Sequence, residues 1–223
     1  MTSSTLAMDP GLQVMTGPAA ETLWSGALAE VFEIGQKMMR RVRTDMRSGR
    51  LASPAFLFGP CGQRTVASEL DALMRRVDVE YDIELVAPFE ETESIAGALW
   101  SGRDLLGEEH EDGLAKLRFA AGTLDLPLHA HEHSDRFIAV RSGRGIFWWS
   151  DESLSTFGGM NVHSVPVNSG DVLVFTRGLL HTFSAPDESL LLLSYHSPEI
   201  PFDDPRQYTI AAPRWTPRMG LPT

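Results

Sequence analysis

The sequence predicts a mainly β domain, an antiparallel sandwich or barrel, that carries an α-helical extension at its N-terminus. Eight short apolar runs follow one another between residues 113 and 198, separated by Gly, Pro, Asp and Ser. Such a succession is typical of antiparallel sheets and not of alternating strands and helices. Before these runs, residues 18–77 place apolar side chains at the spacing of amphipathic helices.

The elements divide the chain into four parts. These are a flexible tail (1–17), a helical extension with the first strand or strands (18–112), the β-barrel (113–198) and a C-terminal arm that covers a sheet edge (199–223). Within the extension, a long helix should end near Gly49, which can adopt the left-handed conformation of a helix stop. A second helix is predicted over residues 64–77, and alternation of polar and apolar residues predicts a strand over 79–85.

The charge balance limits the partners. Nineteen Lys and Arg against 30 Asp and Glu give a formal net charge of −11, and such a field repels nucleic-acid backbones and anionic membrane surfaces. No run of 18 apolar residues is present, so no membrane-spanning helix is predicted. Cys61 is the single cysteine, which suits a reducing compartment. We therefore expect a cytoplasmic protein that binds a small molecule and neither nucleic acid nor membrane.

Three histidines form the candidate metal site. His129 and His131 stand two residues apart in "LPLHAH", so on a strand both rings point to the same side of the sheet. His181, in the apolar run "LLHTF", supplies a third ligand from another strand. Three neutral imidazoles suit Fe, Zn, Cu or Ni, whereas Mg and Ca prefer oxygen ligands. Any one of them alone is typical of a structural core histidine, and the pair favours a metal. We expect His133 and His163 at the surface.

These residues and the glycines around them resemble the two motifs of the cupins. The matching positions are Gly122, Pro127, His129, His131 and Gly143 in the first motif, and Gly170, Gly178 and His181 in the second. Thr176 and Ala185 stand where the family has Pro and Asn. The resemblance implies a cupin jelly-roll β-barrel with one divalent transition metal held by His129, His131 and His181. It also implies a homodimer, because cupins often dimerise through their sheets.

The glutamate of the first cupin motif is missing. Arg136 occupies its register, four residues after His131 and with six residues between it and Gly143; a shorter gap would place Asp135 there instead. We favour Arg136 facing inward because it keeps the spacing of the motif, and Asp135 remains the alternative. The donor fork of a guanidinium matches a carboxylate, so Arg136 is a candidate for holding an acidic substrate. The competing hypothesis is that Arg136 pairs with Glu132 or Asp135 at the barrel rim.

The resemblance implies oxygenase chemistry. Some cupin dioxygenases, among them those acting on small thiols and on diketones, use a three-His iron centre without the glutamate. We therefore expect an Fe(II)-dependent dioxygenase or oxygenase of a small, anionic molecule, with Arg136 and His196 as catalytic residues. His196 ends a strand and could act as a proton donor near the metal. Two alternatives stay open: a Zn-dependent lyase or isomerase, since three imidazoles accept zinc as well as iron, and a non-catalytic small-molecule-binding or sensing cupin.

Overall fold

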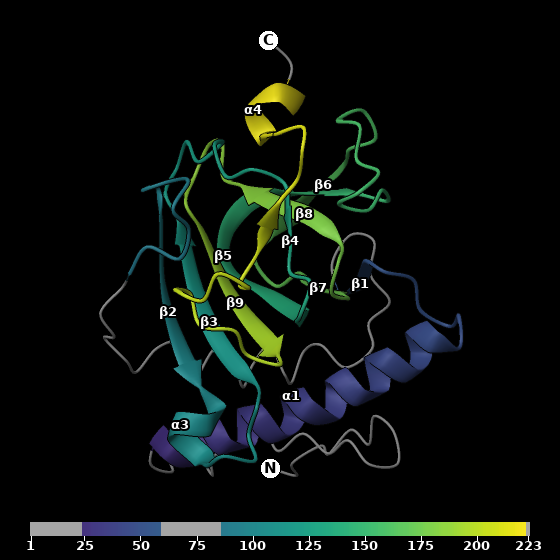
Figure 1. Cartoon of the computed structure of the whole chain (residues 1–223). Helices are drawn as coiled ribbons and strands as arrows, with labels where there is room; N and C mark the ends of the chain where they lie inside the picture. The colour runs from purple at the N-terminus through teal and green to yellow at the C-terminus, as the bar shows by residue number, and fades with distance from the viewer. Residues whose placement is uncertain (1–23, 59–85, 222–223) are drawn as a thin grey trace, which may run out of the picture.

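The computed structural model describes residues 24–58 and 86–221. The expected tail, the second helix (64–77) and the strand over 79–85 lie outside these residues. Within them, the chain forms a curled antiparallel sheet with few helices (Figure 1). None of the helices in the described ranges is long and apolar enough to cross a membrane.

Ten strands form the sheet in the described part of the chain. Their bounds are β1 (Ala55–Phe58), β2 (Ile95–Ser101), β3 (Gly113–Phe119), β4 (His129–Ala130), β5 (Asp135–Ser150), β6 (His163–Asn168), β7 (Val172–Phe175), β8 (Leu180–Ser184), β9 (Leu190–Ser197) and β10 (Thr209–Ile210). Neighbouring strands follow the order β10-β4-β8-β5-β9-β3-β2, while β6 and β7 also pair with β5, and β1 pairs with β7. The curled, antiparallel arrangement is that of a jelly roll, as the resemblance to cupins implied.

β5 is the long strand that takes part in both halves of the curled sheet. Its first half pairs with β9 and β7, and its second half pairs with β8 and β6. The register shifts after Val140, and Gly143 has a φ of 77°. A Cβ at Gly143 would collide with the carbonyl oxygen of Ser189, so the bend requires glycine there. Two of the eight predicted runs, residues 136–143 and 144–150, are therefore one bent strand.

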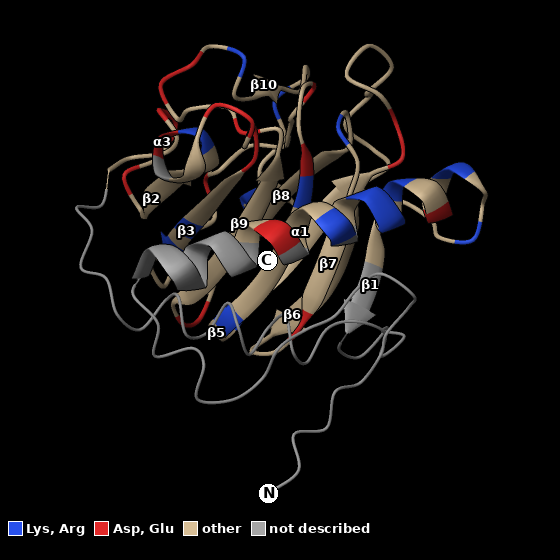
Figure 2. Ribbon diagram, turned by 90° about the horizontal axis from the view of Figure 1, so that it is seen from below, with Lys and Arg blue, Asp and Glu red and all other residues tan. Residues whose placement is uncertain are grey.

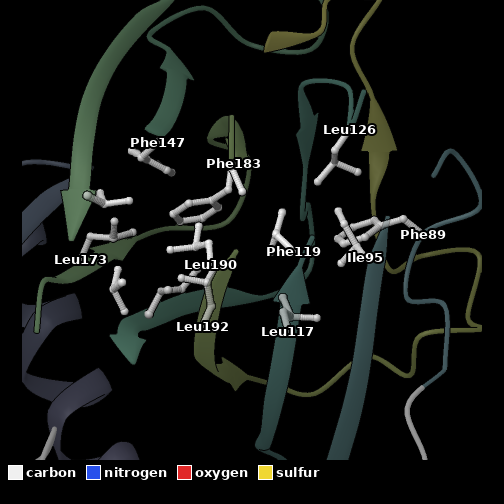
Figure 3. Packing of buried hydrophobic residues seen from close by; sticks show 14 of the residues in the cluster. Phe89, Ile95, Leu117, Phe119, Leu126, Phe147, Leu173, Phe183, Leu190 and Leu192 are labelled. Atoms are coloured by element: carbon white, nitrogen blue, oxygen red, sulfur yellow. The ribbon is translucent and has the colours of Figure 1, made fainter. Parts of the chain in front are cut away.

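Apolar side chains that alternate along the strands fill the barrel interior. The ring centroid of Phe183 lies 4.9 Å from that of Phe147 and 6.2 Å from that of Phe119. Leu190 and Leu192 of β9 belong to the same buried cluster (Figure 3). Each such side chain contributes about 2 kcal/mol by leaving water. The cluster also supplies the apolar wall of the cavity described below.

The C-terminal segment packs on the opposite face of β5. Trp148 and Trp149 are adjacent and point to opposite sides: Trp149 packs against the barrel core, while Trp148 belongs to a second cluster with Trp215. The two indole rings of Trp148 and Trp215 lie 5.4 Å apart. The same C-terminal segment adds β10 beside β4 and ends in the short helix α4 (Pro217–Gly220).

α1 (Trp24–Arg47) lies across the sheet, as Figure 2 shows, and contacts β9 and the short helix α3 (Gly102–Leu106). Its buried stripe comprises Phe32, Met39 and Val42. At Gly35 the helix comes so close to β9 that a Cβ would collide with the ring of Tyr195. Gly49 follows the helix with a φ of 73°, the left-handed conformation expected at this stop.

Candidate metal centre

Three histidine side chains meet in the barrel. His129 begins β4, His131 directly follows that strand, and His181 lies on β8, where it is the antiparallel partner of His129. One ring nitrogen of each lies within 4.8 Å of the others. All three residues are buried, with relative exposures of 3%, 7% and 3%. The strand pairing thus brings together the His-x-His pair and the histidine fifty residues later, as the two motifs predicted.

The backbone holds each ring with one nitrogen free. The Nδ1 atoms of His129, His131 and His181 lie 2.9, 2.5 and 2.9 Å from the carbonyl oxygens of Pro127, Gln207 and Leu179. A carbonyl oxygen only accepts, so each Nδ1 must carry the hydrogen and donate it. In a neutral ring, the Nε2 lone pair then remains available to a metal.

Burial keeps these rings neutral. Loss of solvation lowers the pKa of His129 to about 4 and holds those of His131 and His181 well below the ordinary value. Neutral imidazole is the form that binds transition metals. The donor set therefore fits a divalent metal ion of the borderline-soft kind.

The three histidines thus lie at the positions that resemble the cupin motifs, on paired strands of a curled antiparallel sheet. The glutamate of the first motif has no counterpart among the residues that line the cavity, and Arg136 lies there.

Arg136 and Asp135 point to opposite faces of β5. Arg136 lines the cavity with the three histidines and is 1% exposed. Asp135 accepts from Arg43 Nε at 2.6 Å and lies 3.2 Å from Arg177 Nη2. Asp135 therefore serves as the anchor of α1, and the alternative register with Asp135 facing the cavity is not the one observed.

The guanidinium of Arg136 has only neutral oxygen partners among the described residues. Nη1 donates to Ser134 Oγ, and Nη2 donates to Gln207 Oε1 at 3.3 Å. The ion pair with Glu132 or Asp135 considered for the barrel rim does not form, because Glu132 accepts from Thr209 and Asp135 is held by other arginines. Burial lowers the pKa of Arg136 to about 9, so the side chain stays charged at neutral pH.

His196 lies next to Arg136 across the β5–β9 ladder. It lines the same cavity, is 2% exposed, and its buried Nδ1 has no hydrogen-bond partner. Burial, with a further effect of Arg136, holds the pKa of His196 well below its ordinary value. An uncharged imidazole thus lines the cavity beside Arg136, with its Nδ1 buried and unpartnered.

Gln207 is a site residue that the sequence did not reveal. Its backbone oxygen accepts from His131, and its side-chain oxygen accepts from Arg136. It lies in the C-terminal arm, in "DDPRQYT", where neither strand alternation nor a motif singles it out. Only the path of the arm over the barrel, fixed by the pairing of β10 with β4, brings it to the cavity.

The cavity is small and has both polar and apolar lining residues. Its free volume is about 30 Å³, enough for about two water-sized ligands. Its polar lining comprises the three histidines, Arg136, Ser194, His196 and Gln207, and its apolar lining includes Phe89 and Phe202. Burial is the main cause of the lowered pKa of His129 and His131, and the positive charge of Arg136 lowers both further. The guanidinium therefore lies close to the candidate ligands.

His133 and His163 lie away from the cavity. Both are exposed, and neither lines the cavity. His163 Nε2 is 3.1 Å from Asp151 Oδ2 at the end of β6.

No family model matches the sequence, and a search of curated proteins gives no match. Among solved structures, the chain is similar to an oxalate oxidase, with 18% identity, a TM-score of 0.42, and coverage of 58% of this chain and 60% of that chain. It is also similar to oxalate decarboxylase from Bacillus subtilis (16%, TM-score 0.40, 51% and 27% covered) and from Lactobacillus farciminis (16%, 0.41, 53% and 32%). The Bacillus subtilis enzyme has Mn(II) centres. The matches span less than two thirds of the oxalate enzymes, and likeness at this level identifies no metal or substrate for this chain.

Proposed function

We propose that this chain is a cupin and a metal-dependent enzyme, an Fe(II) oxygenase that acts on a small anionic molecule. One observation carries the proposal: a buried guanidinium without a carboxylate partner shares a cavity of about 30 Å³ with three free imidazole nitrogens. His129, His131 and His181 would hold the metal through Nε2. Arg136 would bind the anion, and His196, which lines the same cavity, would contact the substrate or move a proton.

Charge supports an anionic substrate. Three neutral histidines leave the two positive charges of a divalent ion uncompensated, and Arg136 adds a third. Bringing these charges together in a water-poor cavity is costly unless a negative group joins them. A substrate anion supplies that group.

The donor set supports iron or zinc over manganese. Mn²⁺ prefers carboxylate, carbonyl and water oxygens, whereas imidazole suits Fe and Zn. When bound, Fe(II) would supply oxygen activation and electron transfer, while zinc would supply Lewis-acid chemistry. The apolar lining of the cavity, with Phe89 and Phe202, would exclude bulk water from the reacting molecule.

Metal analysis and oxygen uptake test this function. Protein purified without added metal should contain close to one transition-metal ion per chain. After anaerobic loading with Fe(II), it should consume oxygen only when a substrate from a panel of small carboxylates and thiols is added. Zinc-loaded protein and His181→Ala serve as controls and should consume none. If the zinc form converts a member of the panel without oxygen uptake, the protein is a lyase or isomerase and the oxygenase proposal is wrong.

We also propose that the enzyme acts in the cytoplasm as a homodimer that associates through its sheets. Light scattering coupled to gel filtration should then give twice the chain mass of 24.6 kDa. A mass that stays at one chain across a hundredfold range of concentration would exclude the dimer.

A further inference from the structure

We infer that the cavity contains a carboxylate subsite formed by Arg136 and His196 and held in place by Gln207, so that the substrate is a small carboxylate. The inference rests on the proposed function for the neighbouring metal. It goes further in naming the chemical group that is recognised and the residue that orients the recognition.

The first step is the unused capacity of Arg136. A guanidinium has five N–H donors in a rigid plane; in Arg136 one donates to Ser134 Oγ and one to Gln207 Oε1. The remaining N–H groups have no acceptor among the described residues, although the side chain is 1% exposed. Two neighbouring N–H groups match the two oxygens of one carboxylate. A planar carboxylate can therefore accept hydrogen bonds from the Arg136 N–H groups that have no acceptor in the described part of the protein.

The second step is the position of His196. Its strand register places it directly beside Arg136 on the cavity side. Its ring is uncharged, because burial holds its pKa well below the ordinary value, so it can lie beside Arg136 without adding a second positive charge. A ligand held by Arg136 within the cavity would therefore lie against the His196 ring.

The third step is the orientation supplied by Gln207. The same residue accepts from His131 through its backbone and from Arg136 through its amide. The carboxylate subsite and one metal-binding histidine are therefore fixed to a single point of the C-terminal arm. Because the amide is neutral, Gln207 orients the guanidinium without cancelling its charge. A glutamate at this position would cancel it.

The size of the cavity favours a carboxylate over larger anions. A free volume of about 30 Å³ suits a group with few heavy atoms, and Phe89 and Phe202 border it. A phosphate or sulfate has more oxygens than Arg136 and His196 can satisfy, and its extra charge would remain desolvated.

Calorimetric binding of acetate to the zinc-loaded protein tests the subsite, because the zinc form removes redox turnover. Acetate should bind, and acetamide, which has nearly the same shape but no charge, should bind at least about tenfold more weakly. Gln207→Glu delivers a carboxylate to Arg136 from within the protein, so it should weaken acetate binding by at least about tenfold while metal content stays at the wild-type level. Glu132→Gln changes an exposed carboxylate of the neighbouring loop and should leave acetate binding unchanged.

Arg136→Lys separates recognition by the donor fork from simple attraction. It keeps the positive charge and loses the fork, so acetate should bind about tenfold more weakly than to the wild type. Equal acetate affinity in wild type, Gln207→Glu and Arg136→Lys would mean that acetate binds the metal alone, and it would overturn the subsite. Acetate and acetamide binding alike would overturn it as well. Acetate recognition as expected, with no oxygen uptake by the Fe(II) form, would leave the subsite intact and reject the oxygenase instead.

Discussion

The buried charge of Arg136 shapes the site at the scale of single residues. Removing a guanidinium from water costs several kcal/mol unless hydrogen bonds and an opposite charge compensate, and the described partners, Ser134 and Gln207, are neutral. Burial is the main cause of the lowered pKa of His196, and the positive charge of Arg136 lowers it further. A second proton on the neighbouring imidazole is therefore unfavourable. Cation and neutral imidazole together favour an anionic ligand.

Arg136→Glu should tighten metal binding. The substitution removes a positive charge near the three histidines and returns a carboxylate to the register of the missing motif glutamate. The change in Coulomb energy favours the metal ion, so metal affinity measured by competition with a chelator should rise at least about tenfold.

Arg136→Gln controls for the loss of charge alone. It removes the cation without adding a ligand, so its metal affinity should lie between those of the wild type and Arg136→Glu. Identical affinities in all three proteins would show that residue 136 does not interact with the metal, and the role of Arg136 as a substrate clamp beside it would have to be abandoned.

The three histidines should be individually necessary for the metal. His129→Ala, His131→Ala and His181→Ala each leave two imidazoles, too few for tight binding of a borderline-soft ion in a site without carboxylates. Each variant should lose most of its metal in elemental analysis. His133→Ala and His163→Ala, which alter exposed histidines outside the cavity, should keep the wild-type stoichiometry. Retention of metal in His181→Ala would show that the second motif is misassigned.

At the scale of elements, the alternation of apolar residues predicted where most strands lie, but not how they bend or which face of a strand meets its neighbours. The runs that became β3 and β6 to β9 are recognisable because apolar residues repeat and turn residues bound them. The two runs of β5 were separated at "RSGRG" because glycines and charges there resemble a turn, whereas Gly143 in fact allows one strand to bend against Ser189. The choice between Asp135 and Arg136 depends on which face of β5 meets α1, and that contact is tertiary.

The ion pairs of Asp135 should hold α1 on the barrel. Burial raises the pKa of Asp135, but hydrogen bonds from Arg177 and Arg43 outweigh it and leave the pKa below the ordinary 3.8. Arg43 Nη2 also donates to the backbone oxygen of Ser197 at 2.9 Å. Asp135→Asn should therefore lower the free energy of unfolding by about 2 kcal/mol at pH 7, measured by urea denaturation.

The stabilisation by the Asp135 carboxylate should depend on pH. A carboxyl group with a depressed folded-state pKa stabilises the protein above its unfolded pKa of 3.8, and this stabilisation is lost as the pH falls through the lower folded value. The difference between wild type and Asp135→Asn should thus shrink when the urea titration is repeated near pH 3. Lys37→Ala removes an exposed pair with Glu33 on the same helix and should change stability by less than about 0.5 kcal/mol. If Asp135→Asn is as stable as the wild type at pH 7, the ion pairs of Asp135 do not hold α1 on the barrel.

At the scale of the whole molecule, the site is assembled from distant parts of the chain. The histidines come from β4 and β8 and the segment after β4, Arg136 from β5, and Gln207 from the C-terminal arm. The His-x-His motif could be recognised because its spacing is local. Gln207 could not, because its role depends on where an extended arm crosses the barrel. Local patterns therefore predicted the three histidines that meet in the barrel, whereas the contact of Gln207 with Arg136 required the three-dimensional path of the arm.

The N-terminal region should be part of the same folding unit as the barrel. Deleting residues 1–77 would remove α1, whose buried stripe covers β9, and β1, which pairs with β7. The deletion would expose apolar surface around Tyr195 and an unpaired edge at β7, and both promote association. This variant should aggregate, whereas deletion of residues 1–15, which are polar and aperiodic, should leave the soluble yield, gel-filtration profile and metal content unchanged. A soluble, metal-loaded barrel beginning near Val79 would instead show that the helical extension is a separate module.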